Sequence, residues 1–179
     1  AAGLLFQQVE ALGVPVFGTG FNIWDTDRKF ATAWMRGKDR MQPPFKTSSS
    51  EDIYALILEA AQKGESLFVK EQGGEALKAH YKYLNSIPVF KEIADKMAMA
   101  GQSFPTFQIM HCAYFSHGYL MFISFDPVPD AYDIFKRFAK VFEQTYIRFL
   151  DLQKAEAQAI EATKRASVDR VRAEIASMR

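Results

Sequence analysis

The sequence predicts an α+β domain with a central antiparallel sheet of about five strands, covered by helices on both faces, and with a long C-terminal helix. Runs with apolar residues at every second position alternate with runs at helical spacing. The two strongest strands, residues 104–115 and 119–125, carry apolar side chains on both of their faces. A sheet of this kind must be covered on both sides. From Pro129 to Met178 neither glycine nor a further proline occurs.

The first elements are predicted to be a helix and an antiparallel hairpin. Leu5, Val9 and Leu12 share one face of a helix over 4–12, which Gly13 ends. Alternation then favours two strands and a polar turn, with a proline-containing loop after them. These four segments are the strands 15–24 and 28–35, the turn 25–27 and the loop 37–50.

The middle of the chain is predicted to hold three helices and one strand. Serines before Glu51 and Asp52 indicate a helix start, and Gly64 ends that helix. Its apolar stripe is Ile53, Leu56, Ile57, Ala60 and Ala61. A strand at 66–71 and helices at 75–85 and from Pro88 to about Gly101 complete the set.

The C-terminal helix is predicted to have about fifty residues, which at 1.5 Å per residue is about 70 Å. A helix that long cannot pack entirely on a domain of this size, so its end is expected to project and to pair with a second copy. A four-three spacing typical of a two-stranded coiled coil supports the pairing. This seam consists of Val168, Val171, Ile175 and Met178. The predicted domains are therefore 1–152, a globular body, and 153–179, a dimeric coiled-coil helix.

Composition argues against a nucleic-acid-binding, a disulfide-stabilised or a membrane-spanning protein. Lys and Arg number 22 against 21 Asp and Glu, so no nucleic-acid partner is expected. A single cysteine excludes internal disulfides and fits a reducing compartment. No apolar run is long enough for a membrane span, and the first residues lack a signal-peptide pattern. A cytoplasmic location is expected.

The sequence offers no catalytic or metal-binding constellation. His111 and Cys112 are neighbours on a strand, so their side chains point to opposite faces and cannot readily meet one substrate or one ion. A hydrogen-bonded histidine and a buried structural cysteine are the favoured interpretation. Gly18 and Gly20 indicate close backbone packing or room for a ligand. An enzyme that uses Cys112 or His111 remains an alternative.

Several local motifs carry a resemblance to a known family. They are Gly20-Phe21-Asn22-Ile23-Trp24, His80-Tyr81-Lys82-Tyr83-Leu84, Phe115-Ser116-His117-Gly118-Tyr119-Leu120 and Phe138-Ala139-Lys140-Val141-Phe142-Glu143-Gln144-Thr145-Tyr146. Together with the order of elements, they resemble a GAF-like sensory domain of bacterial multi-domain sensor kinases. The segment 168–173 resembles the helix that joins such a domain to its next module, with Asp169 where glutamate is usual.

The resemblance implies a GAF or PAS fold, a role in two-component signal transduction and a small-molecule pocket between the sheet and its middle helices. The residues that could line it are Phe21, Trp24, Trp34, His80, Tyr81, Tyr83, His111 and Tyr114. Any histidine kinase activity would belong to a downstream module. The ligand and any cofactor stay open, and a domain that only dimerises or spaces its neighbours is the alternative.

Overall fold

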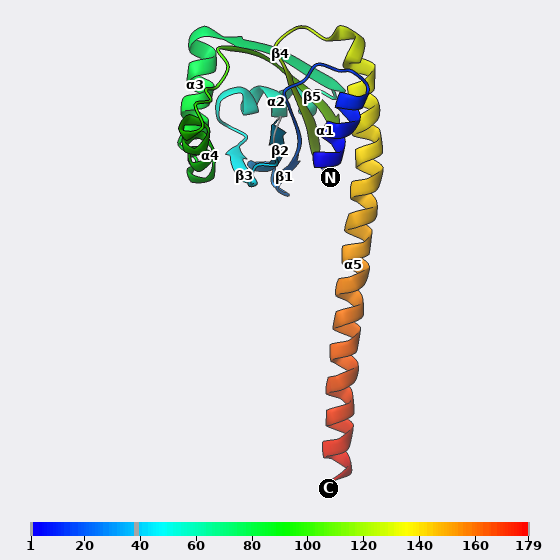
Figure 1. Cartoon of the computed structure of the whole chain (residues 1–179). Helices are drawn as coiled ribbons and strands as arrows, with labels where there is room; N and C mark the ends of the chain where they lie inside the picture. Colours follow the sequence, from blue (N-terminus) through cyan, green and yellow to red (C-terminus); the bar gives the residue numbers. More distant parts are fainter. Residues whose placement is uncertain (1, 38–39, 179) are drawn as a thin grey trace. The chain divides into compact units, whose positions relative to one another are not determined.

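The computed structural model describes residues 2–37 and 40–178 of the chain (Figure 1). Its centre is an antiparallel sheet with the strand order β3-β2-β1-β6-β5-β4. The strands are β1 (Gly18–Trp24), β2 (Phe30–Gly37), β3 (Phe45–Ser48), β4 (Leu67–Gly73), β5 (Phe107–Phe115) and β6 (Gly118–Ser124). Strands β1 and β6 pair with each other in the middle, so the first and last strands along the chain form the centre of the sheet.

Helices cover both faces of the sheet, as the two-sided apolar pattern of β5 and β6 predicts. The helices are α1 (Ala2–Ala11), α2 (Asp52–Gln62), α3 (Gly74–Asn85), α4 (Pro88–Met99) and α5 (Tyr132–Ser177), with a short 3-10 helix at Pro129–Ala131. The α+β class, the antiparallel sheet and the long C-terminal helix are therefore confirmed.

One apolar core lies between the sheet and α2, α3 and α4. Met110 and Cys112 of β5 and Met121 of β6 point into it, and Ile57, Leu84 and Ile93 meet them from the three helices. The opposite face lies under α1 and the start of α5, where the ring of Phe135 stacks on Phe122 at a centroid distance of 4.1 Å. Alternate residues of each strand thus enter two different layers.

The sheet has one strand more than the predicted five. Residues 45–48 form β3, which pairs with β2, so the assignment of 37–50 as a loop was wrong at this point. Phe45 and Thr47 are buried and alternate with the more exposed Lys46 and Ser48. That alternation spans only four residues between a Pro-Pro pair and a serine run, which is too short to indicate a strand by itself.

Two leucines that the sequence places in apolar stripes are exposed. Leu12 follows the last residue of α1 and is 59% exposed, and Leu56 of α2 is 43% exposed. In α2 the buried stripe runs through Tyr54 instead, because the Tyr54 ring packs against the rings of His80 and Tyr83 on α3, each at 6.0 Å. Neither leucine therefore belongs to the buried apolar face of its segment, so the two predicted stripes were wrong at these positions.

Two glycines allow close approaches inside the sheet. A Cβ atom on Gly118 would lie 1.8 Å from the carbonyl oxygen of Asn22, and one on Gly20 would lie 2.3 Å from the carbonyl oxygen of Trp34. Neither position tolerates a side chain without a shift of the backbone. Gly18, in contrast, would meet only ordinary contacts, the nearest at 3.5 Å from Ile123.

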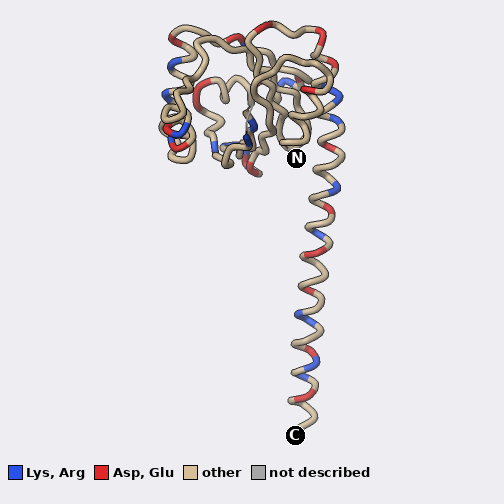
Figure 2. The backbone as a smooth tube through the Cα atoms, in the orientation of Figure 1, with Lys and Arg blue, Asp and Glu red and all other residues tan. Residues whose placement is uncertain are grey.

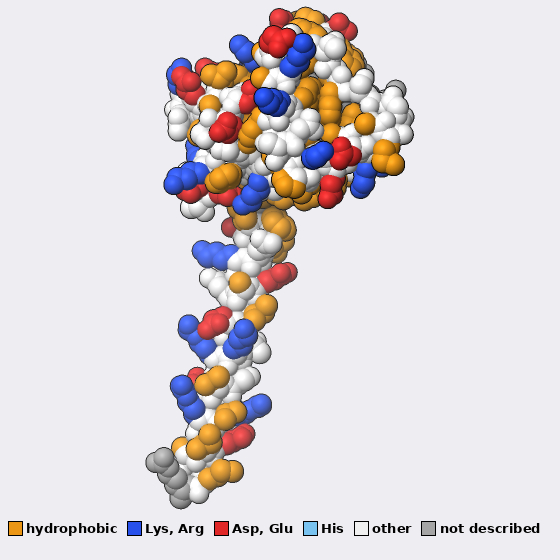
Figure 3. Space-filling model, turned by 90° about the vertical axis from the view of Figure 1, so that its left-hand side faces the viewer, with side chains coloured by type: hydrophobic (Ala, Val, Ile, Leu, Met, Phe, Trp, Pro, Cys, Tyr) orange, Lys and Arg blue, Asp and Glu red, His pale blue; other side chains and the backbone are white. Residues whose placement is uncertain are grey.

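The described residues form two units, one ending at Lys140 and the other beginning at Val141. In the second unit, α5 is exposed at every described position from Asp151 onward, and apolar side chains recur among charged ones (Figure 3). Positive and negative charges are interspersed along the helix and over the first unit (Figure 2). Among the described residues, no helix is long and apolar enough to cross a membrane.

Candidate ligand cleft

A cleft of about 1170 Å³ lies within the first unit, between the core face of the sheet and α3 and α4. Its floor is built from short or flexible side chains of the central strands, among them Asn22, Ala33 and Met110. Its rim includes exposed residues of α4 and of the following loop, such as Lys96 and Ser103. The volume exceeds the 300–1,000 Å³ typical of ligand pockets, so a small organic molecule would fit.

Methionines dominate the flexible part of the lining. The chain has seven methionines. Those that line the cleft are Met35, Met41, Met97, Met110 and Met121. Because methionine has an unbranched, polarisable side chain, it adapts to ligands of different shapes. The lining therefore favours an apolar ligand whose outline the protein does not fix rigidly.

Aromatic rings form one wall of the cleft. The rings of Tyr81 and Phe104 are stacked, with centroids 4.3 Å apart and planes 20° apart. Phe90 continues the stack, with its centroid 5.5 Å from that of Phe104, and Phe45 meets Phe90 edge to face at 5.4 Å. Because stacked rings cover one another's faces, this wall presents mainly ring edges, and it forms a rigid apolar surface.

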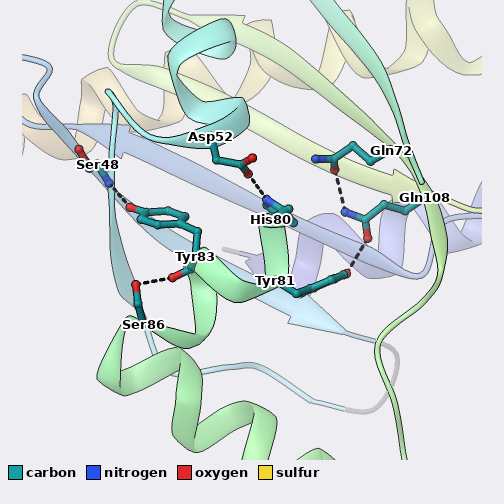
Figure 4. Close-up of polar contacts among 8 residues, drawn as sticks. All are labelled: Ser48, Asp52, Gln72, His80, Tyr81, Tyr83, Ser86 and Gln108. Atoms are coloured by element: carbon teal, nitrogen blue, oxygen red, sulfur yellow. Dashed lines mark hydrogen bonds and ion pairs between the residues drawn. The ribbon is translucent and has the colours of Figure 1, made fainter. Parts of the chain in front are cut away.

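Polar groups of the wall and floor bond to one another (Figure 4). The Tyr81 hydroxyl donates to Gln108 Oε1 at 2.7 Å, and Gln108 Nε2 donates to Gln72 Oε1 at 3.0 Å. Gln72 and Gln108 are direct neighbours across β4 and β5. Burial raises the pKa of the Tyr81 hydroxyl well above its usual value, so this group stays a neutral donor.

A histidine–aspartate pair joins α3 to the start of α2. His80 is only 2% exposed, and its Nδ1–H donates to Asp52 Oδ2 at 2.5 Å. Partial burial by itself raises the pKa of the Asp52 carboxyl, but the hydrogen bonds from His80 and from the Ile53 amide outweigh it and hold that pKa below its usual value. The carboxylate is therefore an acceptor, and it fixes the orientation of the His80 ring beside the cleft.

Asn22 presents an unsatisfied donor to the cleft. Its side chain is 1% exposed, it lies in the central strand β1, and Nδ2 has no hydrogen-bond partner among the described residues. A buried amide hydrogen without a partner costs roughly 1–3 kcal/mol. A ligand that accepts this hydrogen bond would recover that free energy.

The predicted pocket residues divide among three places. His80 and Tyr81 line the cleft. Trp24, Tyr83 and Tyr114 lie in the same core but outside the lining, where the Tyr114 hydroxyl donates to the carbonyl of Ile57 at 2.7 Å. The remaining three, Phe21, Trp34 and His111, lie on the opposite face of the sheet, with the Phe21 and Trp34 rings stacked at 5.0 Å.

His111 and Cys112 enter different layers, as their adjacent positions predict. His111 Nδ1–H donates to the carbonyl of Phe122 at 3.0 Å, and its ring lies 5.3 Å from that of Phe135. Burial lowers the pKa of His111, although the bond to Phe122 opposes this shift. Cys112 is fully buried in the other layer, and burial raises the pKa of its thiol, so the nucleophilic thiolate is disfavoured.

The structure assigns cleft positions to residues that the sequence analysis did not select, chiefly Asn22 and Gln108. The sequence indicates these two positions in part, because each is a polar residue with apolar neighbours within a strand. A polar residue among apolar neighbours in a strand indicates a buried polar side chain, which is a candidate for a binding site.

Across residues 2–37 and 40–178, no group of three histidine, cysteine, aspartate or glutamate side chains could hold a metal ion.

The four predicted seam residues are all exposed; three of them lie in α5, and Met178 follows its last residue. Val168 and Val171 are 48% and 50% exposed, and Ile175 and Met178 are 56% and 83% exposed.

Comparisons with protein-family models, with curated proteins and with solved structures each returned no match for this chain.

Proposed function

We propose that this chain is a GAF-like sensory domain of a bacterial signal-transduction protein, with a sensor histidine kinase as the expected parent. The cleft binds a small molecule, and α5 passes the change in packing to an output module as half of a dimeric coiled coil. The domain itself is not catalytic. Any kinase activity belongs to a module outside these 179 residues.

The order of the elements supports the GAF-like part of the proposal. Apart from the added β3, the structure contains the helix, hairpin, helix, strand, two helices, two strands and long helix expected of that fold. The position of the cleft also fits, because it lies between the sheet and the middle helices. A roomy cleft on one face of the sheet, with the start of a long helix packed on the other face, is more useful to a sensor than to a spacer.

The observation that carries the proposal is the change in character along the single helix α5. Phe135 and Ala139, near its start, are buried, and Phe135 stacks on Phe122 of the sheet. Its last residues are exposed and nonetheless carry apolar side chains at coiled-coil spacing. One continuous helix thus carries both a packing site on the sheet and an exposed apolar seam, which is the connection that a relay requires.

A second copy of the chain is the proposed partner of the seam. Val168 and Ile175 occupy one set of heptad positions, and Val171 and Met178 occupy the other. Val168 and Ile175 are then the a positions of the heptad, where β-branched residues favour two-stranded coiled coils. The ion pair between Arg172 and Asp169, at 3.9 Å, lies beside the seam and leaves its apolar positions uncovered.

Sedimentation velocity tests this dimer. Glutamate substitutions at Val171 and Ile175 place charges into the seam, and we expect a dimer that is weakened by about tenfold or more. Ala173 is the matched control, since it lies between the two on the opposite side of the helix. The variant Ala173→Glu adds the same charge and should leave the dimer unchanged. Equal dimer fractions in all variants would remove the relay from the proposal.

A further inference from the structure

We infer that the cleft is built for an uncharged, largely apolar organic molecule that carries a hydrogen-bond acceptor, to which the side-chain amide of Asn22 donates at the floor. This inference rests on the proposed function, because it names the ligand class of the proposed sensory site. It follows from the polar groups of the lining, from where its charges lie, and from the shape of its walls.

Asn22 offers a ligand a buried donor at the floor of the cleft. Two lining residues have a buried nitrogen without a partner among the described residues: Nδ2 of Asn22 and Nε of Arg36. The Arg36 guanidinium is engaged elsewhere, since its Cζ lies 5.2 Å from the ring centroid of Phe6 in α1. The Tyr81 hydroxyl and the Gln108 amide already bond within the protein. Nδ2 of Asn22 is therefore a donor that an incoming acceptor would satisfy.

The distribution of charge excludes an ion from the interior of the cleft. Three of its charged lining residues, Arg40, Glu92 and Lys96, are exposed and lie at the rim. The fourth, Arg36, directs its guanidinium to the ring of Phe6 in α1, away from the cleft. His80, which is buried, is already paired with Asp52. A charged ligand group inside would lose its hydration without gaining a counter-charge, and that loss costs several kcal/mol. The interior therefore selects a neutral group.

The walls favour an apolar molecule. The Tyr81, Phe104 and Phe90 rings are stacked, so the side of the stack is apolar and rigid. Methionines from the opposite side, such as Met35 and Met121, can follow the outline of an inserted ligand. An apolar ligand would pack between the ring stack and the methionines with its acceptor toward Asn22.

Two dyes with one ring system provide a test on the wild-type chain. Nile red is neutral and carries a ring carbonyl, whereas Nile blue replaces that carbonyl with an amino group and is cationic. We expect Nile red to bind with a rise in fluorescence and a dissociation constant in the micromolar range, and Nile blue to bind at least about tenfold more weakly. Equal affinity for the two dyes would overturn the inferred ligand class.

Matched variants locate the contact. Asn22→Leu removes the donor and should weaken Nile red binding by about tenfold. Thr19→Val is the control, because Thr19 lies on the same strand, is fully buried and also has a hydroxyl without a partner among the described residues, yet it does not line the cleft. It should leave Nile red affinity within about twofold. Melting curves would verify that both variants fold.

A third variant separates the failure of this inference from the failure of the proposed site. Ala33→Leu enlarges a side chain on the cleft floor and should abolish the binding of Nile red. If Ala33→Leu blocks both dyes while Asn22→Leu changes neither, the cleft binds ligands but the inferred class is wrong. If Ala33→Leu binds the dyes as tightly as the wild type does, or if no form of the protein binds them, the cleft is not their site. The ligand-binding part of the proposed function is then contradicted together with the inference. The dimer measured by sedimentation stays independent of these outcomes.

Discussion

Asp52 begins α2 with a backbone φ of 49°, in the left-handed region that few residues other than glycine adopt. Such a conformation costs about 1–3 kcal/mol and persists only where neighbouring contacts hold it. The hydrogen bond from His80 is one of these contacts, and it ties α2 to α3 beside the cleft. The single carboxylate therefore affects both the start of a helix and the position of a cleft residue.

The pH dependence of stability should reveal the charge of Asp52. Its pKa in the folded protein lies below the ordinary value of 3.8, so the ionised form stabilises the fold above that pH, and the contribution is lost as the pH falls through the lowered pKa. At pH 7 we expect Asp52→Asn to reduce the free energy of unfolding by about 1 kcal/mol, a figure reduced for the partial exposure of the carboxylate.

Urea denaturation at pH 7, 5 and 3 measures this difference. The gap between Asp52→Asn and the wild type should persist at pH 5 and narrow at pH 3, because the stabilisation is lost as the pH falls below 3.8 and through the lowered pKa of the folded protein. Glu59→Gln removes an exposed carboxylate that is paired with Lys63 on the same helix, and it should change stability little. If the difference in the free energy of unfolding were the same at pH 3 as at pH 7, the effect would come from the packing of the side chain and not from its charge.

At the scale of elements, long regular patterns were sufficient and short ones were not. The double-sided apolar pattern of β5 and β6 predicted that helices cover both faces, and the absence of glycine and proline predicted α5. Strand β3 was missed because a four-residue strand becomes recognisable only through its pairing with β2. The face that α2 buries was partly wrong, since Tyr54 is placed by α3, a contact that no local pattern encodes.

The candidate site could be predicted only in part for a related reason. The sequence identified His80 and Tyr81 on a helix that faces the sheet, but whether strand residues share a cleft depends on sheet parity and register. Phe21 and Trp34 form a pair across β1 and β2 on the face away from the cleft, whereas Asn22 and Ala33 pair on the cleft face. A register shift of one residue would exchange the two sets.

The packing of α5 on the sheet should depend on one aromatic residue. Phe135 is fully buried between Phe122 and His111, so Phe135→Ala should lower the free energy of unfolding by about 3–5 kcal/mol. Phe149 of the same helix is 50% exposed, and Phe149→Ala should cost less than about 0.5 kcal/mol. Chemical denaturation of the two variants measures both values. Similar losses would show that the sheet does not hold α5 through Phe135.

For the molecule as a whole, the proposal requires that the cleft and the α5 seam influence each other. Such coupling is reciprocal: a ligand that changes the dimer dissociation constant must bind monomer and dimer with different affinities. Because a dimer holds two clefts, saturation changes that constant by the square of the affinity ratio. A spacer domain predicts a factor of one. The distinction needs no knowledge of the output module, because both equilibria belong to this chain.

Ile175→Glu gives access to the monomer for this comparison. We expect the affinity for Nile red to differ by at least about fivefold between the wild-type dimer and Ile175→Glu, the lower limit of typical allosteric coupling. The dimer dissociation constant, measured by sedimentation with and without saturating Nile red, should shift by the square of that factor, about 25-fold, because each dimer holds two clefts. Ala173→Glu should match the wild type in both experiments. If the wild type dimerises and binds the dye but neither constant responds to the other, α5 transmits nothing from the cleft, and the domain serves as a dimeric spacer.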